Sequence, residues 1–217
     1  MLDRASGAIV GSANMAQTSD TVSMIKAWLA SDFLRRTEEN GQRPTADRLA
    51  DLEVMIRDSD NDAADRTYAD NGGSASIDRL ISICQLTDSA SVPGRWGETI
   101  ISARDAVRMG ACIANGSAAG DTWTPWVLDM MRNVRGDGDF GIREALPMGR
   151  SQIAIKNGWL LRDEDNEWHT NCLAISDTWV LSVLQRYPSQ GSYDTDFQHT
   201  ADVCRNMASQ VLKTAVG

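Results

Sequence analysis

The chain has 217 residues and a formal net charge of −9, with 42% apolar and 24% charged residues. This composition can build the core of one large domain or two small ones. The acidic balance argues against a nucleic-acid partner, because phosphate binding needs a basic face. The sequence predicts neither a membrane span nor a signal peptide, and its first residues look like the inside of a strand and turn.

The first part of the chain is predicted to be mainly helical, after a short hairpin over residues 2–18 in which Ala8-Ile9-Val10 has strand character. Residues 87–101 are predicted to be irregular, and Pro125 is expected to mark a helix start. Apolar residues at helical spacing, between turn and cap residues, predict helices over 23–36, 45–57, 63–69, 74–84, 102–114 and 126–134.

The pattern changes after residue 152. Runs rich in β-branched and aromatic residues predict strands over 153–161, 168–176 and 178–184. A polar hairpin turn is expected at 163–166, and Asp194-Thr195-Asp196 is expected to cap a last helix that ends near Lys213. The order of strand, helices, strands and helix predicts an α+β fold in which an all-helical block is inserted between parts of a sheet.

A short motif stands where the first helix is expected to begin, with Ser23 three residues before Lys26. On a helix these residues share a face, so the hydroxyl and the amine can meet. A serine hydroxyl becomes a useful nucleophile when a neighbouring base takes its proton. Burial can lower the pKa of a lysine enough for that role. A plain helix cap followed by a solvated lysine gives the same pattern.

Two further motifs follow in order, Ser59-Asp60-Asn61 and Lys156-Asn157-Gly158. Singly they are also typical of a capping turn and a strand end. Together the three motifs resemble those of the penicillin-recognising serine acyl-enzymes, Ser-x-x-Lys, Ser-Asp-Asn and Lys-Thr-Gly. This superfamily includes class A β-lactamases and penicillin-binding D-alanyl-D-alanine peptidases. The resemblance covers nearly the whole chain and is strongest to compact, class A-like serine hydrolases.

The resemblance implies a β-lactamase/transpeptidase-like α+β fold that forms one discontinuous unit. Residues 1–22 and 145–217 would form a sheet lobe, residues 23–144 a helical lobe, and the active site would lie in the cleft between them. A five-stranded antiparallel sheet would combine residues 1–18 with 152–184, and the last helix would cover it.

The four cysteines permit two disulfides in an oxidising compartment or four buried thiols in a reducing one. They form no Cys-x-x-Cys pair and His169 and His199 are far apart, so no metal site or cofactor is expected. The topology implied by the resemblance would bring together Cys84 with Cys112 and Cys172 with Cys204 if the chain is exported. Family members act outside the cytoplasmic membrane, whereas the sequence leaves the localisation of this chain open.

The resemblance also assigns catalytic roles. Ser23 would attack an amide or lactam carbonyl, Lys26 would take or relay its proton, and Ser59 would pass a proton to the leaving nitrogen. The backbone N–H groups of Ser23 and Trp159 would form the oxyanion hole, whose donors stabilise the developing negative charge.

The same comparison assigns substrate contacts. Asn61 would hold the side-chain amide of the substrate, and Lys156 would attract a substrate carboxylate through its positive charge. Asn157, beside Gly158, stands where the family has Thr or Ser, whose hydroxyl bonds that carboxylate. An asparagine can donate through its NH₂ group but is larger, so this position departs from the family pattern.

Class A β-lactamases hydrolyse the acyl-enzyme with a water that a glutamate on a long loop activates. The matching segment here, residues 86–101, is short, and its acidic residues are Asp88 and Glu98. Glu98 is a weak candidate base that we expect to be solvated or paired with Arg95. Without such a base the acyl-enzyme would turn over slowly.

The leading hypothesis is therefore a monomeric serine hydrolase that forms an acyl-Ser23 intermediate with a β-lactam or a peptidoglycan-peptide-like amide, with antibiotic resistance as one implied role. Three alternatives stay open. One is a D-alanyl-D-alanine carboxypeptidase or transacylase, one is a penicillin-binding module that has lost turnover, and one is a truncated, non-functional relative.

Overall fold

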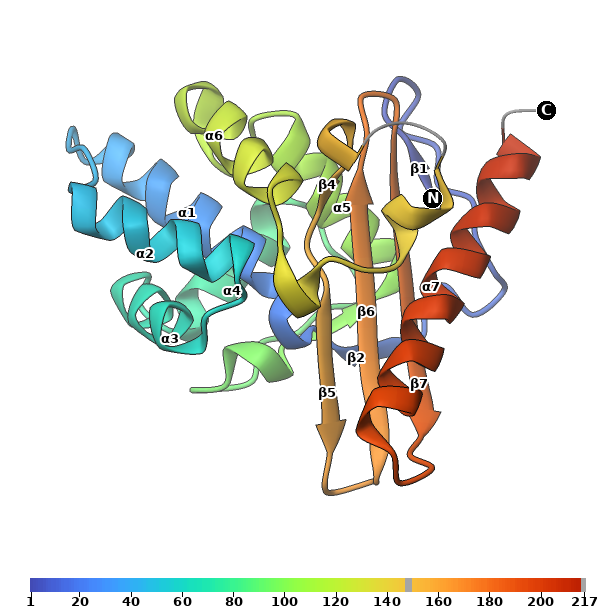
Figure 1. Ribbon diagram of the computed structural model, residues 1–217. Coiled ribbons are helices and arrows are strands. Elements are labelled where there is room, and N and C mark those ends of the chain that lie inside the picture. Colours follow the sequence, from blue (N-terminus) through green and yellow to red (C-terminus); the bar gives the residue numbers. More distant parts are fainter. Residues whose placement is uncertain (147–149, 216–217) are drawn as a thin grey trace.

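A computed structural model describes residues 1–146 and 150–215 and places a β-sheet beside a block of helices (Figure 1). The main sheet is antiparallel and five-stranded: β1, β7, β6 and β4 lie in that order, and β5 also pairs with β6. The α+β prediction is confirmed. The strands are β1 (Leu2–Asp3), β4 (Ala154–Ile155), β5 (Gly158–Arg162), β6 (Glu167–Ile175) and β7 (Trp179–Pro188).

The strand predicted over 153–161 is two short strands with one register. Ile155 pairs with Ala174 and Gly158 pairs with Asn171, so β4 and β5 lie on the same line along β6. Lys156 and Asn157 fall in the gap between them. The third sequence motif therefore lies at the break between β4 and β5, where Lys156 N still donates to Leu173 O at 3.1 Å.

The hairpin predicted over residues 2–18 forms over residues 1–10, where Ile9 bridges Leu2 and the main chains of Met1 and Val10 bond each other. Beyond it, β2 (Thr18–Asp20) instead pairs with β3 (Ile100–Ser102) in a separate two-stranded sheet. The segment between them is mostly polar, and Val10 is 57% exposed. A strand without an apolar face has nothing to fix its register against the sheet.

Seven α-helices complete the described fold: α1 (Lys26–Glu39), α2 (Ala46–Arg57), α3 (Asn61–Asp70), α4 (Ser74–Ile83), α5 (Ala103–Ala114), α6 (Gly120–Arg132) and α7 (Tyr193–Ala215). Thr45, Asp60 and Ser102 cap α2, α3 and α5 by accepting a backbone N–H bond. The start predicted for α6 is wrong, because the helix begins at Gly120 and Pro125 lies inside it. Burial of Val127 and Met131 anchors the helix beyond the proline.

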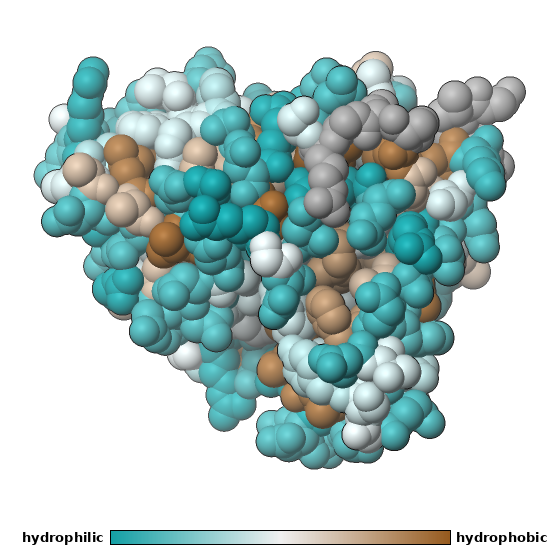
Figure 2. Space-filling model, in the orientation of Figure 1, coloured by the Kyte–Doolittle hydropathy of each residue, from teal (hydrophilic) through white to brown (hydrophobic). Residues whose placement is uncertain are grey.

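The sheet is covered on both faces. Helix α7 crosses the front of the sheet in Figure 1, and α5 packs on the other face. A Cβ on Gly110 of α5 would lie 2.6 Å from Val180 Cγ1, so the absence of a side chain lets α5 approach β7 closely. Trp168 is fully buried under α7, where its ring contacts Tyr193 and Phe197. Hydrophilic residues cover most of the face seen in Figure 2.

Two disulfides join Cys84 to Cys112 and Cys172 to Cys204, the pairs predicted for an exported chain. The first links the end of α4 to α5, and the second links β6 to α7. No helix among the described residues has both the length and the apolar character needed to cross a membrane. The predicted range 145–217 includes residues 147–149 and 216–217, which lie outside the described residues, and the division into lobes stays a prediction.

Candidate active site

Ser23 lies in a four-residue 3₁₀ turn, Val22–Ile25, and α1 begins only at Lys26. The helix expected over 23–36 therefore starts three residues later and runs on to Glu39. Val22 has a φ of +47°, which is unusual for a β-branched residue and bends the chain sharply before the serine. Such backbone strain is typical of functional turns.

The start of β5 touches this turn through the main chain. A Cβ on Gly158 would lie 2.6 Å from Ser23 N and 2.8 Å from Met24 N, so only glycine fits. Lys156 N donates to Leu173 O at 3.1 Å, and hydrogen-bonded pairs alternate along an antiparallel ladder. Trp159 therefore points its N–H away from β6, while the Ser23 N–H belongs to the unpaired first turn of a helix.

The Lys26 side chain is fully buried and is held by oxygen atoms of the second motif. Its Nζ donates to Ser59 O at 2.5 Å and to Asn61 Oδ1 at 2.6 Å, and it lies 3.4 Å from Ser59 Oγ. Burial lowers the pKa of Lys26 to about 8, although Asp60 and Asp65 act in the opposite direction. Among the described residues Lys26 Nζ has no hydrogen bond to the Ser23 hydroxyl, and the meeting of these two groups stays a prediction.

Lys156 approaches the same serine from the sheet. It is fully buried, and its Nζ lies 3.0 Å from Ser59 Oγ and 3.1 Å from Asn157 O. Burial, and then the nearby Lys26, hold the pKa of Lys156 well below its ordinary value. Ser59 itself has a φ of +63°. The three motifs thus meet around one hydroxyl, which lies between two amines.

Asn157 is buried and faces protein. Its Nδ2 donates to Gly138 O at 3.1 Å and to Phe140 O at 2.8 Å, which uses both N–H bonds of the amide. The Phe140 ring in turn packs edge-on against Trp159, with ring centres 5.7 Å apart. Sequence reasoning could not find these partners, because the loop that carries them lies far from Asn157 in the chain.

Glu98 is held by two arginines rather than by the lysines. It pairs with Arg95 at 3.0 Å, as expected, and also with Arg162 at 3.4 Å. The neighbouring Trp96 instead reaches the site, where its ring centre lies 4.9 Å from Lys26 Nζ and its Nε1 donates to Asp65 Oδ1 at 2.7 Å. No local pattern in the sequence predicts that Trp96 or Asp65 lies beside Lys26.

The other acidic candidate in this segment, Asp88, also lies away from the lysines. It pairs with Arg104 at 2.6 Å, and it accepts a bond from Ser102 at 2.7 Å. The short segment therefore places the indole of Trp96 beside Lys26, whereas its carboxylates, Asp88 and Glu98, pair with arginines instead.

The strand that leads to Ser23 is tied to the sheet by Asp20. This carboxylate pairs with Arg162 at 2.5 Å and with His169 Nδ1 at 2.6 Å. The other ring nitrogen of His169 lies 2.9 Å from Asp165. Asp165, Glu167 and His169 offer three ligand atoms within 4.8 Å of one another, and the histidine is already bonded to carboxylates on both sides.

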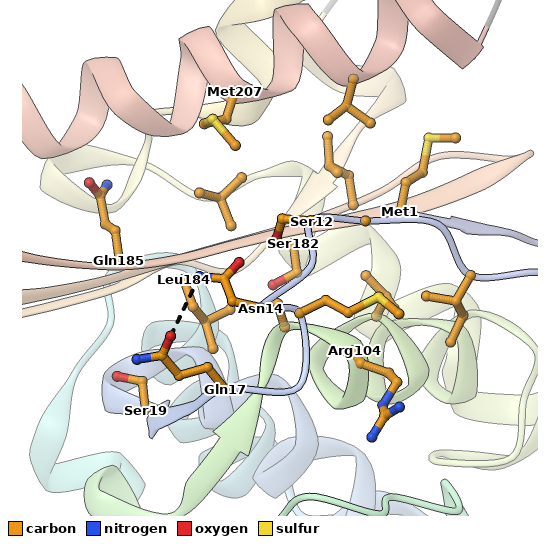
Figure 3. Close-up of a pocket in the computed structure, with 18 of the residues that line it drawn as sticks. Met1, Ser12, Asn14, Gln17, Ser19, Arg104, Ser182, Leu184, Gln185 and Met207 are labelled. Carbon is orange, nitrogen blue, oxygen red and sulfur yellow. Dashed lines mark hydrogen bonds between the residues drawn. The ribbon is translucent and has the colours of Figure 1, made fainter.

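A separate hollow of about 420 Å³ lies between the N-terminal segment, β7, α5 and α7 (Figure 3). Ser182, Arg104 and Met207 are among its lining residues, and none of the three motifs contributes to it. The buried Ser182 hydroxyl has no hydrogen-bond partner among the described residues. This hollow is therefore distinct from the cluster around Ser59.

Comparison with solved structures identifies the fold. A variant of the ancestral class A β-lactamase GNCA4 bound to 5(6)-nitrobenzotriazole matches with a TM-score of 0.72 and 17% identity, over 99% of this chain and 91% of that one. The L2 protein complexed with relebactam matches with a TM-score of 0.74 and 17% identity, over 97% and 89%. The chain therefore has a β-lactamase-like fold, and the fold implied by the three motifs is confirmed.

Comparison with curated proteins identifies longer relatives. Proteins named lipoprotein LppW from Mycobacterium tuberculosis and Mycobacterium bovis are 30% identical over 166 residues, which cover 74% of this chain and 52% of theirs. The chain thus spans about half the length of the curated relatives it matches. No protein-family model matches the sequence.

Proposed function

We propose that the chain is a serine hydrolase that reacts with a β-lactam or a peptide-like amide through an acyl-Ser23 intermediate. One observation carries the proposal: Ser59 Oγ lies 3.0 Å from Lys156 Nζ and 3.4 Å from Lys26 Nζ, beside the turn that holds Ser23. Two buried amines around one hydroxyl form a route for protons, and such perturbed groups gather at functional sites.

In the proposed acylation, the Ser23 hydroxyl proton passes to Lys26 while Ser23 Oγ bonds the carbonyl carbon. A lysine with a pKa of about 8 has a minor neutral fraction near neutral pH, far larger than an ordinary lysine has, and that fraction can accept the proton. The carbon–nitrogen bond then breaks, and Ser59 protonates the leaving nitrogen and regains a proton from an amine. The N–H groups of Ser23 and Trp159 receive the negative charge on the carbonyl oxygen.

Hydrolysis of the acyl-enzyme is expected to be slower than its formation. Trp96 lies beside Lys26, and Glu98 is paired with Arg95 and Arg162. A paired carboxylate is a poor general base, so we expect a long-lived acyl-enzyme. This arrangement favours a peptidase, transacylase or penicillin-binding module as the second candidate over an efficient β-lactamase.

Labelling with a fluorescent penicillin, followed by intact-mass spectrometry, tests the proposal. We expect a stable adduct on the wild type, no adduct on Ser23→Ala, and an unchanged adduct on Ser12→Ala, an exposed serine outside the motifs. Rapid loss of label from the wild type would identify a β-lactamase instead. An adduct that persists on Ser23→Ala, or none on the wild type, would overturn the assignment.

A further inference from the structure

The resemblance assigns Asn157 and Lys156 to a substrate carboxylate, but both side chains already bond other groups of the protein. Asn157 is 1% exposed, and both N–H bonds of its amide go to carbonyl oxygens of the loop at Gly138 and Phe140. A ligand could use this amide only by displacing the loop, which would leave two backbone carbonyls unpaired. An unpaired buried polar group costs about 1–3 kcal/mol, so the amide is unavailable in practice.

Lys156 is poorly placed to meet the same ligand. It is 0% exposed, and its Nζ already contacts Ser59 Oγ and Asn157 O. Burial and the neighbouring Lys26 hold its pKa well below its ordinary value, because both disfavour the charged form that would attract a carboxylate.

An aromatic surface stands beside these two residues. Trp159 is half-buried, and its ring packs against Phe140 at 5.7 Å and Phe197 at 5.9 Å. A Cβ on Gly138 would lie 3.6 Å from the Trp159 ring, so the loop also lies against the indole. Apolar ligand groups gain from burial on such a surface, whereas a carboxylate loses its hydration there.

The residues on either side of Ser59 in the sequence, Asp58 and Asp60, are acidic. Asp58 is paired with Arg135 at 2.5 and 2.7 Å, so this guanidinium is already compensated. The charge of Asp60 acts on Lys26 and opposes the charge of an anionic ligand there.

We infer that this site takes an acyl donor with no carboxylate beside the reacting amide, an ester or an uncharged amide, and that Asn157 is the specificity-determining residue. The inference rests on the proposed acyl-Ser23 function, because it names the substrate class of that reaction. Asn157 acts by holding the Gly138–Phe140 loop against Trp159, so that an aromatic wall stands where an anion would otherwise be bound.

Benzylpenicillin and its methyl ester form a matched probe pair, because they differ only in the carboxylate. Binding is measured by calorimetry on Ser23→Ala, which removes the chemistry and leaves the site. We expect the ester to bind at least as tightly as the acid. Tighter binding of the acid, or no binding of either compound, overturns the inference.

Acylation of the wild type is followed in parallel by intact-mass spectrometry, with the ester expected to react at least as fast as the acid. If neither compound acylates Ser23, the proposed function fails, and the binding ratio on Ser23→Ala still decides the inference. The two failures are therefore distinguishable.

Asn157→Thr sharpens the test. It removes both bonds to the loop and supplies a free hydroxyl, so the preference should shift toward the acid by roughly tenfold or more, the worth of one hydrogen bond to a charged group. Asn133→Thr is the matched control, because that amide bonds Asp129 on α6 and should leave the ratio unchanged. An unchanged ratio in folded Asn157→Thr would remove Asn157 from the assignment. Should this variant not fold, the wild-type ratio remains decisive.

Discussion

The molecule buries charge in two different ways. In the helical block, Asp32 is 0% exposed and meets Arg79 at 2.5 and 2.9 Å and Arg35 at 2.5 Å. Around Ser59, Lys26 and Lys156 are equally buried, but their hydrogen bonds go to neutral oxygens. No carboxylate lies within ion-pair distance of either amine among the residues that the structure describes.

This difference separates a structural ion-pair cluster from amines with lowered pKa values. Removing one partner of a buried ion pair leaves the other charge uncompensated, so the cluster at Asp32 holds structure. Burial is the largest cause of the lowered pKa of Lys26 and of Lys156. The second arrangement is the one that a proposed proton carrier needs.

The largest expected effect comes from removing Lys26, the proposed proton carrier. Lys26→Met keeps the length of the side chain but no basic group, so acylation of Ser23 by penicillin should fall by about 10²–10⁴-fold. Stability should hold or rise, because the buried amine is gone. Adduct formation rates and urea midpoints give the two readouts, with the exposed Lys213→Met as control. A loss below tenfold would place Lys26 outside the chemistry.

Removing a paired charge should lower stability and leave acylation nearly unchanged. Asp32→Asn leaves Arg35 and Arg79 without their buried partner, so unfolding free energy should drop by about 3–5 kcal/mol. Acylation per folded molecule should stay near the wild-type value, because Asp32 does not face Ser59. Urea unfolding measures the loss, and Glu39→Gln, which breaks an exposed pair with Arg35, should cost less than about 1 kcal/mol. Equal losses of unfolding free energy in Asp32→Asn and Glu39→Gln would contradict this comparison.

The free energy of unfolding should also depend on pH, in the direction set by the lowered pKa of Lys26. The pKa of Lys26 is about 8 in the folded chain against 10.5 when unperturbed, so between these values the unfolded chain binds more protons. Stability from this group therefore rises with pH across that window, by up to about 3 kcal/mol. Urea unfolding at both ends, in wild type and Lys26→Met, isolates the contribution. A rise of the same size in both proteins would exclude Lys26 as its source.

Glu98 should show the smallest effect. Its pairs with Arg95 and Arg162 are partly exposed, so Glu98→Gln should change stability by less than about 1 kcal/mol. Decay of the Ser23 adduct should change by less than about threefold, far below the range of a general base. A hundred-fold slowing, on the order of that range, would show that the short segment does activate a water.

Local signals in the sequence predicted much of the fold, including the helix that Ser102 caps and the alternation of helical and extended segments. The three motifs were also read correctly as parts of one cluster. Two contacts were not predicted: that of Trp96 with Lys26 and that of Asn157 with Phe140. These contacts join residues far apart in the chain, and nothing in the local pattern of either partner specifies the other.

The same limit applies to the turn at Ser23. Spacing predicted a helix there, but the left-handed Val22 and the close approach of Gly158 impose a 3₁₀ turn instead. Helical spacing therefore did not specify where the Ser23 hydroxyl lies relative to Lys26. Helical spacing gives the angle between two residues only when both lie on the same regular helix.

The meeting of Gly158 with the Ser23 turn has a consequence for how this protein can change over generations. The two segments touch main chain to main chain, with a built Cβ only 2.9 Å from Thr21 O and closer still to two backbone nitrogens. No side chain stands between them, so substitutions elsewhere can accumulate without altering their separation. Any residue other than glycine at position 158 would push the Ser23 turn and the sheet apart in a single step, and because the clash is with backbone atoms, no later exchange of a neighbouring side chain can relieve it.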